Sequence, residues 1–327
     1  MLLRILIKIV ESIENFIIEK KVKSILIAIS GGQDSILLLR IFHEVKNKLT
    51  MIDKISYIYV DHQWKQNGYK HIEHLINYIK VFKENIIIYQ IYQTTKSESE
   101  CRQQRYNLLQ QYAKKNKYEL IVTGHNSSDK IETSLQNINR TSGKGGLSST
   151  VMANQISNKI FLLRPLLKIN KENIYFLCKK LHLPIWSDST NYIYRIERNR
   201  LRHELIPYIR SFFSEKIEKN ILLSTKNFYY EHEYIKQNAN KLYIYSKHRR
   251  YLAINYQYMN KQHIMLQTKA LQIFYTYNTN MKIHSSIIKK IINRINRQNI
   301  KQIIVFEDQY YTHMLNKQWL YIETKVR

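Results

Sequence analysis

The residues from Ser24 to Leu39, SILIAISGGQDSILLL, decide the fold of the N-terminal part of the chain. Ser24–Ile29 is a short, apolar, β-branched run, which predicts a buried parallel strand, and helical spacing begins at Ile36. Residues 30–35 form a sharp turn between them, and its two glycines let the backbone come close to a ligand. Because the first amides of a helix carry a partial positive charge, this turn is predicted to bind phosphate.

The turn Ser30-Gly31-Gly32-Gln33-Asp34-Ser35 differs from a Walker A loop, because no Lys follows the glycines. Asp34 stands there instead, and a carboxylate beside phosphates requires a divalent cation between them, so the turn is predicted to bind Mg²⁺ with a nucleotide. Two glycines alone would fit an ordinary strand–turn–helix connection equally well. The whole string resembles the SGGxDS motif of the PP-loop ATP pyrophosphatases, which split ATP between the α- and β-phosphates.

The charge of the chain favours a polyanionic partner. The 327 residues include 52 Lys and Arg against 25 Asp and Glu, a net charge of +27, and nucleic acid is the first candidate. An AT-rich gene would also raise the Lys content, but it does not explain clustered Arg. The two cysteines, Cys101 and Cys178, exclude a disulfide framework, a CxxC redox pair and a Cys-rich zinc site.

The distribution of glycine and proline predicts two domains. All seven glycines and all three prolines precede residue 208. We therefore expect a catalytic domain over residues 1–210 and a smaller domain over residues 211–327. The second is predicted to be mainly helical α+β, with helices over 212–245 and 262–297 and three short strands within 303–323.

Strands and helices alternate in the first domain. Further strands are predicted at 54–60, 86–92 and 118–123, with helices at 67–83 and 98–115. This alternation predicts an α/β fold with a doubly wound parallel sheet, whose ligand lies beyond the carboxyl ends of the strands. The turn at 30–35, Asp61-His62 and Gly124-His125 all follow strands, so they are expected to share one cleft.

Two acidic residues open the helix after the last of these strands. Asp129 and Glu132 are three residues apart and share one helical face. They could be acids of an ordinary helix N-terminus. Their place beyond a strand favours a second interpretation, in which they hold a cation, either an amine or a metal.

Two basic segments follow. Arg140 and Lys144 lie in a loop with three glycines, which could be a linker but is glycine-rich for this chain. Four arginines, at 195, 198, 200 and 202, then fall within eight residues. Charged runs of this kind most often form the solvent-exposed face of a helix. The use of Arg in a Lys-rich protein instead favours bidentate contacts with phosphate.

Five strings together resemble the tRNA(Ile)-lysidine synthase family: SGGQDS, HNSSDKIET, RTSGKGGL, RPLL and PIWSDSTNYIYRIERNRLRHELIP. The resemblance covers most of residues 24–208 and implies a short form of the enzyme. It implies that ATP adenylates C2 of the wobble cytidine, position 34, of the tRNA(Ile) with a CAU anticodon. The ε-amine of free L-lysine then displaces AMP, and the modified base pairs with A rather than G.

The resemblance also implies roles for individual residues. It assigns ATP binding to Ser30, Gly31, Gly32, Gln33, Asp34, Ser35, Arg102, Arg105 and His125. It assigns catalysis to Asp34, which would also hold the metal, and to Asp129, Glu132 and Arg195. It assigns tRNA binding to Arg140, Lys144, Arg198, Arg200 and Arg202. Lys130-Ile131 and Thr141 depart from the residues common in the family, so contacts through them are not carried over.

Two other functions stay open at this point. A PP-loop tRNA thiolase would need cysteines to carry sulfur, and a nonenzymatic RNA-binding protein would not need an intact loop. No membrane span is expected, because no stretch approaches 18 uninterrupted apolar residues. The composition suits the plastid stroma, for a plastid-encoded protein, or the cytoplasm of an AT-rich bacterium, and a homodimer is an option that the sequence leaves open.

Overall fold

The computed structural model describes residues 2–61, 68–91, 98–140, 142–157, 159–185, 197–279, 283–296, 303–307 and 309–325. The chain forms two compact units, Met1–Thr225 and Lys226–Arg327. It passes from one to the other within the long helix α10 (Ile217–Ser246). The functional division after residue 210 stays a prediction.

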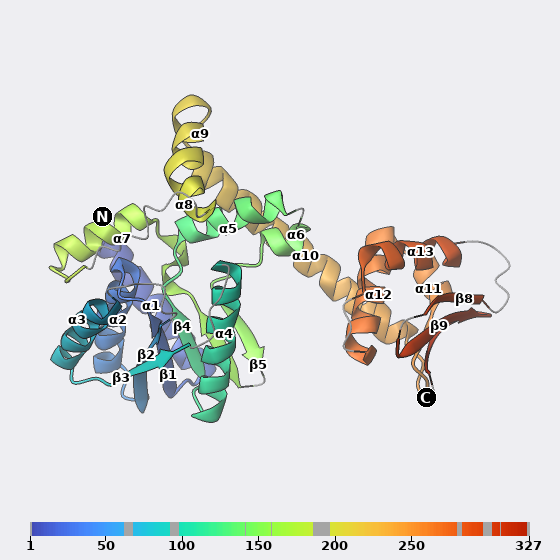
Figure 1. The fold of residues 1–327 in the computed structure, drawn as a ribbon, viewed down its shortest axis with the longest axis horizontal. Coiled ribbons are helices and arrows are strands. Elements are labelled where there is room, and N and C mark those ends of the chain that lie inside the picture. The colour runs from blue at the N-terminus through green and yellow to red at the C-terminus, as the bar shows by residue number, and fades with distance from the viewer. Residues whose placement is uncertain are drawn as a thin grey trace. The chain divides into compact units, whose positions relative to one another are not determined.

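A six-stranded sheet lies at the centre of the first unit, in the order β3-β2-β1-β4-β6-β5 (Figure 1). Its strands are β1 (Ser24–Ile29), β2 (Lys54–Asp61), β3 (Ile86–Gln90), β4 (Leu120–Thr123), β5 (Ala153–Ser157) and β6 (Ile160–Leu163). All neighbouring strands are parallel except β5 and β6, which form an antiparallel pair at one edge. The predicted α/β fold with a doubly wound parallel sheet is confirmed, and the β5–β6 pair is an addition that the sequence did not predict.

Helices cover both faces of this sheet (Figure 1). Besides the start of α10, the described helices of this unit are α1 (Leu2–Lys20), α2 (Gln33–Lys48), α3 (Gly68–Val81), α4 (Glu98–Lys115), α5 (Ser127–Asn139), α6 (Lys144–Leu147), α7 (Lys171–Lys180), α8 (Glu197–Arg200) and α9 (Ile206–Phe212), of which α8 and α9 project away from the sheet. A 3-10 turn, η1 (Pro165–Lys168), precedes α7, and a π-helical turn, η3 (Leu201–Leu205), joins α8 to α9.

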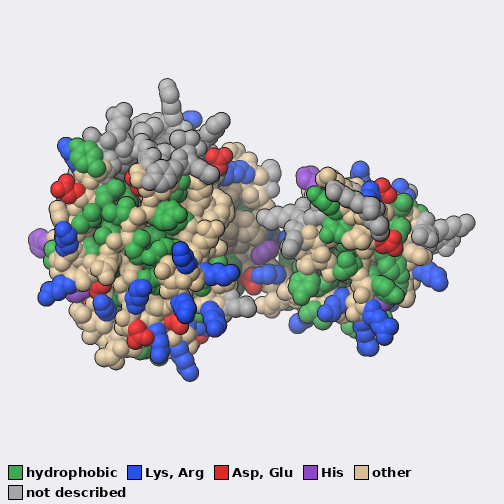
Figure 2. All heavy atoms as spheres, turned by 60° about the horizontal axis from the view of Figure 1, so that its bottom comes forward, with side chains coloured by type: hydrophobic (Ala, Val, Ile, Leu, Met, Phe, Trp, Pro, Cys, Tyr) green, Lys and Arg blue, Asp and Glu red, His purple; other side chains and the backbone are tan. Residues whose placement is uncertain are grey.

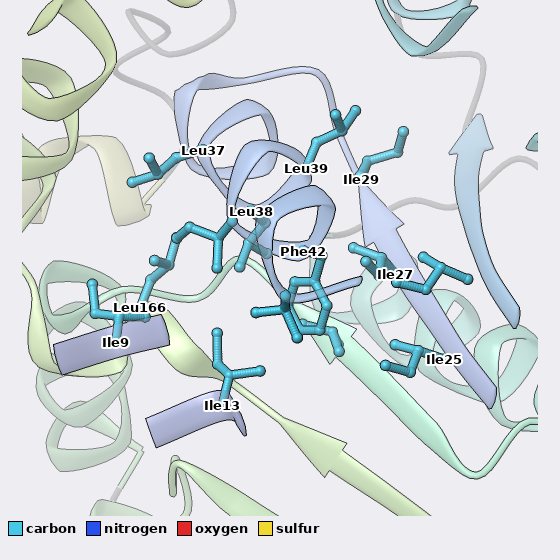
Figure 3. Packing of buried hydrophobic residues seen from close by; sticks show 14 of the residues in the cluster. Ile9, Ile13, Ile25, Ile27, Ile29, Leu37, Leu38, Leu39, Phe42 and Leu166 are labelled. Atoms are coloured by element: carbon cyan, nitrogen blue, oxygen red, sulfur yellow. The ribbon is translucent and has the colours of Figure 1, made fainter. Parts of the chain in front are cut away.

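Alternate residues of β1 face the two layers of helices. Ile25 and Ile27 pack on one side in a cluster with α1 and α2, where Ile13 and Phe42 are fully buried (Figure 3). Leu26 points to the other side, into a smaller cluster with α4. Burial on both faces explains why this strand is a continuous apolar run rather than an alternating one. It also fixes the position of the turn that follows Ile29.

The second unit has its own core and an antiparallel sheet. It contains the end of α10, then β7 (Ala253–Asn255), α11 (Tyr256–Asn260), α12 (Ile264–Thr279), α13 (Ser285–Ile295), β8 (Ile303–Glu307), β9 (Tyr311–Asn316) and β10 (Trp319–Thr324). The sheet order is β7-β10-β9-β8. Leu271, Phe274, Ile292 and Leu320 are buried between this sheet and the helices.

The three predicted C-terminal strands are confirmed, but the single helical stretch over 262–297 was wrong. Two helices occupy it, and α13 begins anew after His284, whose ring nitrogen accepts a hydrogen bond from the Ser286 N–H at 3.4 Å. Among the described residues, no helix is both long and apolar enough to cross a bilayer.

Candidate active site

The turn after β1 has the geometry of an anion site. Gly31 has φ of 75°, a left-handed conformation that favours glycine. The Ser30 N–H donates to Ser35 Oγ at 2.9 Å, and the hydroxyls of these two serines also lie 2.9 Å apart, so the turn is cross-braced. No described side chain caps the N-terminus of α2 at Gly32. Its first amides are therefore available to a phosphate group.

Asp34 lies in the first turn of α2 with one buried oxygen. Oδ1 has no hydrogen-bond partner among the described residues. Burial, followed by the neighbouring Asp129 carboxylate, raises the pKa of Asp34 to about 7, and Lys171 opposes this in part. A side chain at Gly124 would fill the space beside Asp34, since its Cβ would lie 3.4 Å from Asp34 Cβ. A carboxylate with an unused buried oxygen, next to free helix amides, fits a divalent cation bound together with phosphate.

Asp129 is the third residue of α5 and belongs to its capping box. Its N–H donates to Asn126 Oδ1 at 3.0 Å, and its own Oδ2 accepts the Asn126 N–H at 3.0 Å. The ordinary helix-start interpretation of this acid is thus correct, and its other oxygen, Oδ1, accepts a hydrogen bond from Arg198. Burial alone would raise the pKa of Asp129, but Arg198 and the Asn126 backbone outweigh burial and lower it. Asp129 is therefore a carboxylate at neutral pH.

Two arginines from α8 and η3 meet the acidic pair. Arg198 Nη2 lies 2.8 Å from Asp129 Oδ1, and Arg198 Nε lies 2.5 Å from Glu132 Oε2. Arg202 donates from Nε to Glu132 Oε1 at 2.7 Å and from Nη2 to Glu132 Oε2 at 2.9 Å. Glu132 is fully buried. The cation predicted beside these two acids is, in this structure, a pair of guanidinium groups of the same chain.

Arg102 and His125 also lie near Asp129, whose negative charge acts to raise the pKa of each. Burial, and then Arg102, lowers the pKa of His125 to about 3, so its imidazole is neutral. His125 Nδ1 lies 2.9 Å from Thr123 Oγ1, and its ring stacks on Tyr106 at 6.2 Å. The pKa of Arg102 is also lowered, first by burial, and its guanidinium lies 5.6 Å from the centre of the Tyr106 ring.

Arg105 is a further cation of α4, at an exposed position of the helix. Partial desolvation, followed by repulsion from Arg102, lowers its pKa. A phosphate group near these two arginines would offset that repulsion.

Two residues of the cleft were missed by the sequence reasoning. Arg164, the first residue of the RPLL string, is buried and donates from Nη2 to the Tyr106 hydroxyl at 3.3 Å. Lys171 begins α7, and its carbonyl accepts a hydrogen bond from Gln33 Nε2 at 3.1 Å. Burial, and then Arg202, lowers the pKa of Lys171. Their place after a strand and at the start of a helix was the available indication.

The remaining predicted residues lie further out. Arg140 and Arg200 are exposed, with weak or local partners: Arg140 Nη2 lies 3.5 Å from Glu197 Oε2, and Arg200 Nε lies 3.0 Å from Glu204 Oε2. Lys144 is exposed at the start of α6. Arg195 and His62 lie outside the described residues, so their predicted roles stay predictions.

Metal binding by side chains alone finds little support. Within the described ranges, no group of three or more His, Cys, Asp or Glu side chains could hold a metal ion. Any Mg²⁺ at Asp34 would therefore take most of its ligands from a nucleotide and water.

The chain is similar in sequence and in fold to known proteins. A family model described as a PP-loop domain matches residues 5–209. A protein named tRNA(Ile)-lysidine synthase, chloroplastic, from Gracilaria tenuistipitata var. liui is 41% identical over 300 residues, which cover 92% of this chain and 92% of that one. The chain belongs to the tRNA(Ile)-lysidine synthase family.

Further relatives extend the match. The chloroplastic tRNA(Ile)-lysidine synthase of Pyropia yezoensis is 34% identical over 304 residues, covering 93% of this chain and 91% of that protein. Among solved structures, the U34-tRNA thiolase NcsA from Methanococcus maripaludis superimposes with a TM-score of 0.53 at 14% identity, over 63% of this chain and 71% of that one. That likeness shows the fold alone. Membership of the tRNA(Ile)-lysidine synthase family, with its PP-loop domain, implies that the chain uses ATP.

Proposed function

We propose that this protein uses ATP to ligate lysine to C2 of the wobble cytidine of the tRNA(Ile) with a CAU anticodon. In the first step, the C2 oxygen of the cytidine attacks the α-phosphate of ATP, and pyrophosphate leaves. In the second, the ε-amine of lysine attacks C2, the C2–O bond breaks, and AMP leaves. The observation that carries the proposal is the pairing of an intact anion turn at 30–35 with 41% identity over nearly the whole chain.

The chain's own cations would bind and orient the triphosphate. The free amides at the start of α2 suit one phosphate group. Arg102, Arg105 and Lys171 are partly desolvated cations whose lowered pKa values indicate that a bound anion would stabilise them. Charge that develops on the leaving pyrophosphate would then meet preorganised donors rather than water.

Asp34 would hold Mg²⁺ through its unpartnered Oδ1. When bound, Mg²⁺ would neutralise phosphate charge and orient the α-phosphate for attack. Asp34 has a pKa of about 7 in the free protein, so it is only partly ionised at neutral pH. A cation at this site would favour its carboxylate form.

Free L-lysine is the proposed second substrate, and Asp129 and Glu132 are its proposed ammonium partners. In the structure these acids already contact Arg198 and Arg202. Asp129 is the more accessible, because Glu132 is fully buried and accepts from both arginines. We therefore assign the direct contact with lysine to Asp129 and a supporting part to Glu132.

tRNA contact is proposed for the exposed basic side chains Arg140, Lys144 and Arg200. Arg198 and Arg202 are mostly occupied by carboxylates, so their proposed contact with RNA would require those ion pairs to open. The C-terminal unit adds further positive charge. Its role in holding the tRNA is part of the proposal.

The plastid stroma is the proposed location, since the two relatives compared above are named chloroplastic. The cytoplasm of an AT-rich bacterium is the alternative, and a homodimer is a further untested proposal. A thiolase function has less support, because Cys101 and Cys178 are both buried and a sulfur carrier must be accessible.

The direct test is to incubate the protein with ATP, radiolabelled lysine and a tRNA(Ile) transcript with a CAU anticodon, and then to digest the RNA to nucleosides. Label in a modified cytidine, formed with one AMP per lysine, is expected. A transcript with C34 replaced by U is the control. Label in neither RNA, or sulfur transfer in its place, would overturn the proposal.

A further inference from the structure

A groove lies within the second unit, between the exposed face of α10 and the start of α12. It has a volume of about 770 Å³, within the range of small-molecule sites. Tyr234, Asn238, Lys241 and Tyr245 line one wall, and Gln262 and His263 lie on the other. None of these residues belongs to the cleft described above.

The α10 wall carries two exposed aromatic rings in register. Positions 234, 238, 241 and 245 are spaced four, three and four apart, which places them on one helical face. Tyr234 and Tyr245 are 71% and 70% exposed, and they lie about 16 Å apart along a helix that rises about 1.5 Å per residue. The Tyr245 ring rests edge-on against Tyr258, with ring centres 4.7 Å apart, so it is held in place without being covered.

The charge around the groove favours an anionic occupant. Lys241 is the charged residue among the ten that line it, and no carboxylate is among them. Residues 226–327 carry 17 Lys and Arg against 5 Asp and Glu. Figure 2 shows Lys and Arg side chains along one edge of this unit, with hydrophobic side chains between them.

Flat, exposed tyrosine rings beside a lysine fit unpaired nucleotides. Bases stack on aromatic side chains whatever their sequence, while cations contact the phosphates between them. A base-paired helix could not use these rings, because its bases are already stacked on one another. The apolar floor, which includes Leu242 and Met265, suits the faces and edges of bases better than free phosphate.

We propose that the α10–α12 groove binds a short run of unpaired nucleotides of the tRNA substrate, with bases stacked on Tyr234 and Tyr245 and Lys241 at a phosphate between them. The inference rests on the proposed function, because a tRNA substrate is what makes RNA the relevant polyanion. The proposed groove is remote in sequence from the turn at 30–35. Its occupation would give the second unit a preference for unpaired over paired RNA.

The test compares full-length variants in binding to a single-stranded oligoribonucleotide, to an RNA duplex of equal length and to the tRNA transcript. The double variant Tyr234→Ala and Tyr245→Ala is expected to weaken single-strand binding at least tenfold, since it removes both rings on which bases would stack. Duplex binding should change less than twofold. Tyr245→Phe should retain the wild-type affinity, because it keeps the ring.

Tyr277→Ala is the matched control, because this tyrosine is 78% exposed on α12 but does not line the groove. Lys241→Gln should lower the slope of log affinity against log salt by about 0.7 for the single strand, whereas the tyrosine variants should leave that slope unchanged. Thermal melting should give equal midpoints for the tyrosine variants and the control. A loss of RNA affinity can then be attributed to the missing rings rather than to unfolding.

Three results would overturn the inference. Wild-type affinity for the single strand in the double variant would do so, as would equal weakening of duplex and single strand. A change in sedimentation from dimer to monomer with RNA affinity unchanged would assign the groove to a second copy of the chain. Lysine incorporation by the wild-type protein is measured in parallel, so failure of the proposed function is recognised separately from failure of the groove.

Discussion

Arg198 and Glu132, 66 residues apart in the sequence, form an ion pair with Nε and Oε2 separated by 2.5 Å. Glu132 is fully buried and has Arg202 as its second partner. The pair joins the helix that opens beyond β4 to the arginine-rich segment. A buried charge of this kind is tolerated only while its partners are in place.

Glu132→Gln is expected to lower the free energy of unfolding by about 3 kcal/mol, because it leaves Arg198 and Arg202 inside the fold without a full counter-charge. Urea unfolding measured by circular dichroism would show this. Glu204→Gln is the control, since its pair with Arg200 is exposed, and it should change stability by less than about 0.5 kcal/mol. Equal losses in the two variants would mean that the buried pair contributes no more than a surface one.

Asp129→Asn is expected to raise the KM for lysine more than the Kd for ATP, because an ammonium group in a partly buried cleft needs an anionic partner. Calorimetric titration with ATP and a lysine-dependent assay of labelled tRNA separate the two quantities. Loss of ATP binding with an unchanged KM for lysine would instead make Asp129 part of the nucleotide site.

Asp34→Ala is expected to abolish AMP formation while the fold persists, because the side chain lies in the proposed ATP-binding turn rather than among the apolar core residues. Pyrophosphate release in the presence of tRNA is the measurement, with circular dichroism as the check on folding. Comparable rates in the variant and the wild type would remove the metal role assigned to Asp34.

The raised pKa of Asp34 also predicts a dependence of stability on pH. Its carboxyl binds a proton more tightly in the folded state, with a pKa of about 7 against an ordinary value of 3.8. Its contribution to stability is therefore largest below pH 4 and is lost as the pH rises towards 7. Asp34→Asn should be more stable than the wild type at pH 8, by at most about 4 kcal/mol, since one pKa unit corresponds to about 1.4 kcal/mol. The measurement is the melting temperature of the wild type and of Asp34→Asn at pH 5 and at pH 8. If the difference between the two proteins were the same at both pH values, the prediction would be wrong.

A fragment of residues 1–225, the first compact unit, is expected to bind ATP but to lose most of its affinity for tRNA. Fewer phosphate contacts release fewer counterions, so the slope of log affinity against log salt should also flatten. Arg140 and Arg200 should leave the fragment a residual, salt-dependent affinity. Equal slopes for fragment and full chain would show that the second unit does not contact tRNA phosphates.

The sheet and the turn could be predicted from the sequence because their causes are local. Ile25, Ile27 and their neighbours form a continuous apolar run that only a strand covered on both faces can use. The same argument places His125 and Asp129 beyond the end of β4. The β5–β6 pair escaped prediction because β5 is mostly exposed and its sequence, ANQIS, lacks apolar alternation.

The ion pairs of the cleft could not be predicted from the sequence. Asp129 and Glu132 each predicted a bound cation, and the arginines of residues 195–202 predicted a bound phosphate. Nothing local indicates that residues 66 and 70 positions apart satisfy one another. The break between α12 and α13 was also unpredictable, because no glycine or proline marks it in the sequence. Only the structure shows that His284 caps a new helix by accepting a hydrogen bond from the Ser286 N–H.

The separation in sequence between Glu132 and its two arginine partners also bears on the order in which the chain can fold during synthesis. Helix α5 is synthesised well before Arg198 and Arg202 leave the exit tunnel. Until then Glu132 lacks the two arginines that contact it in the folded protein, so α5 is expected to reach its final position only later. The nascent chain is thus expected to complete the candidate active site only after residue 202 emerges, although every strand of the six-stranded sheet has been made by residue 163.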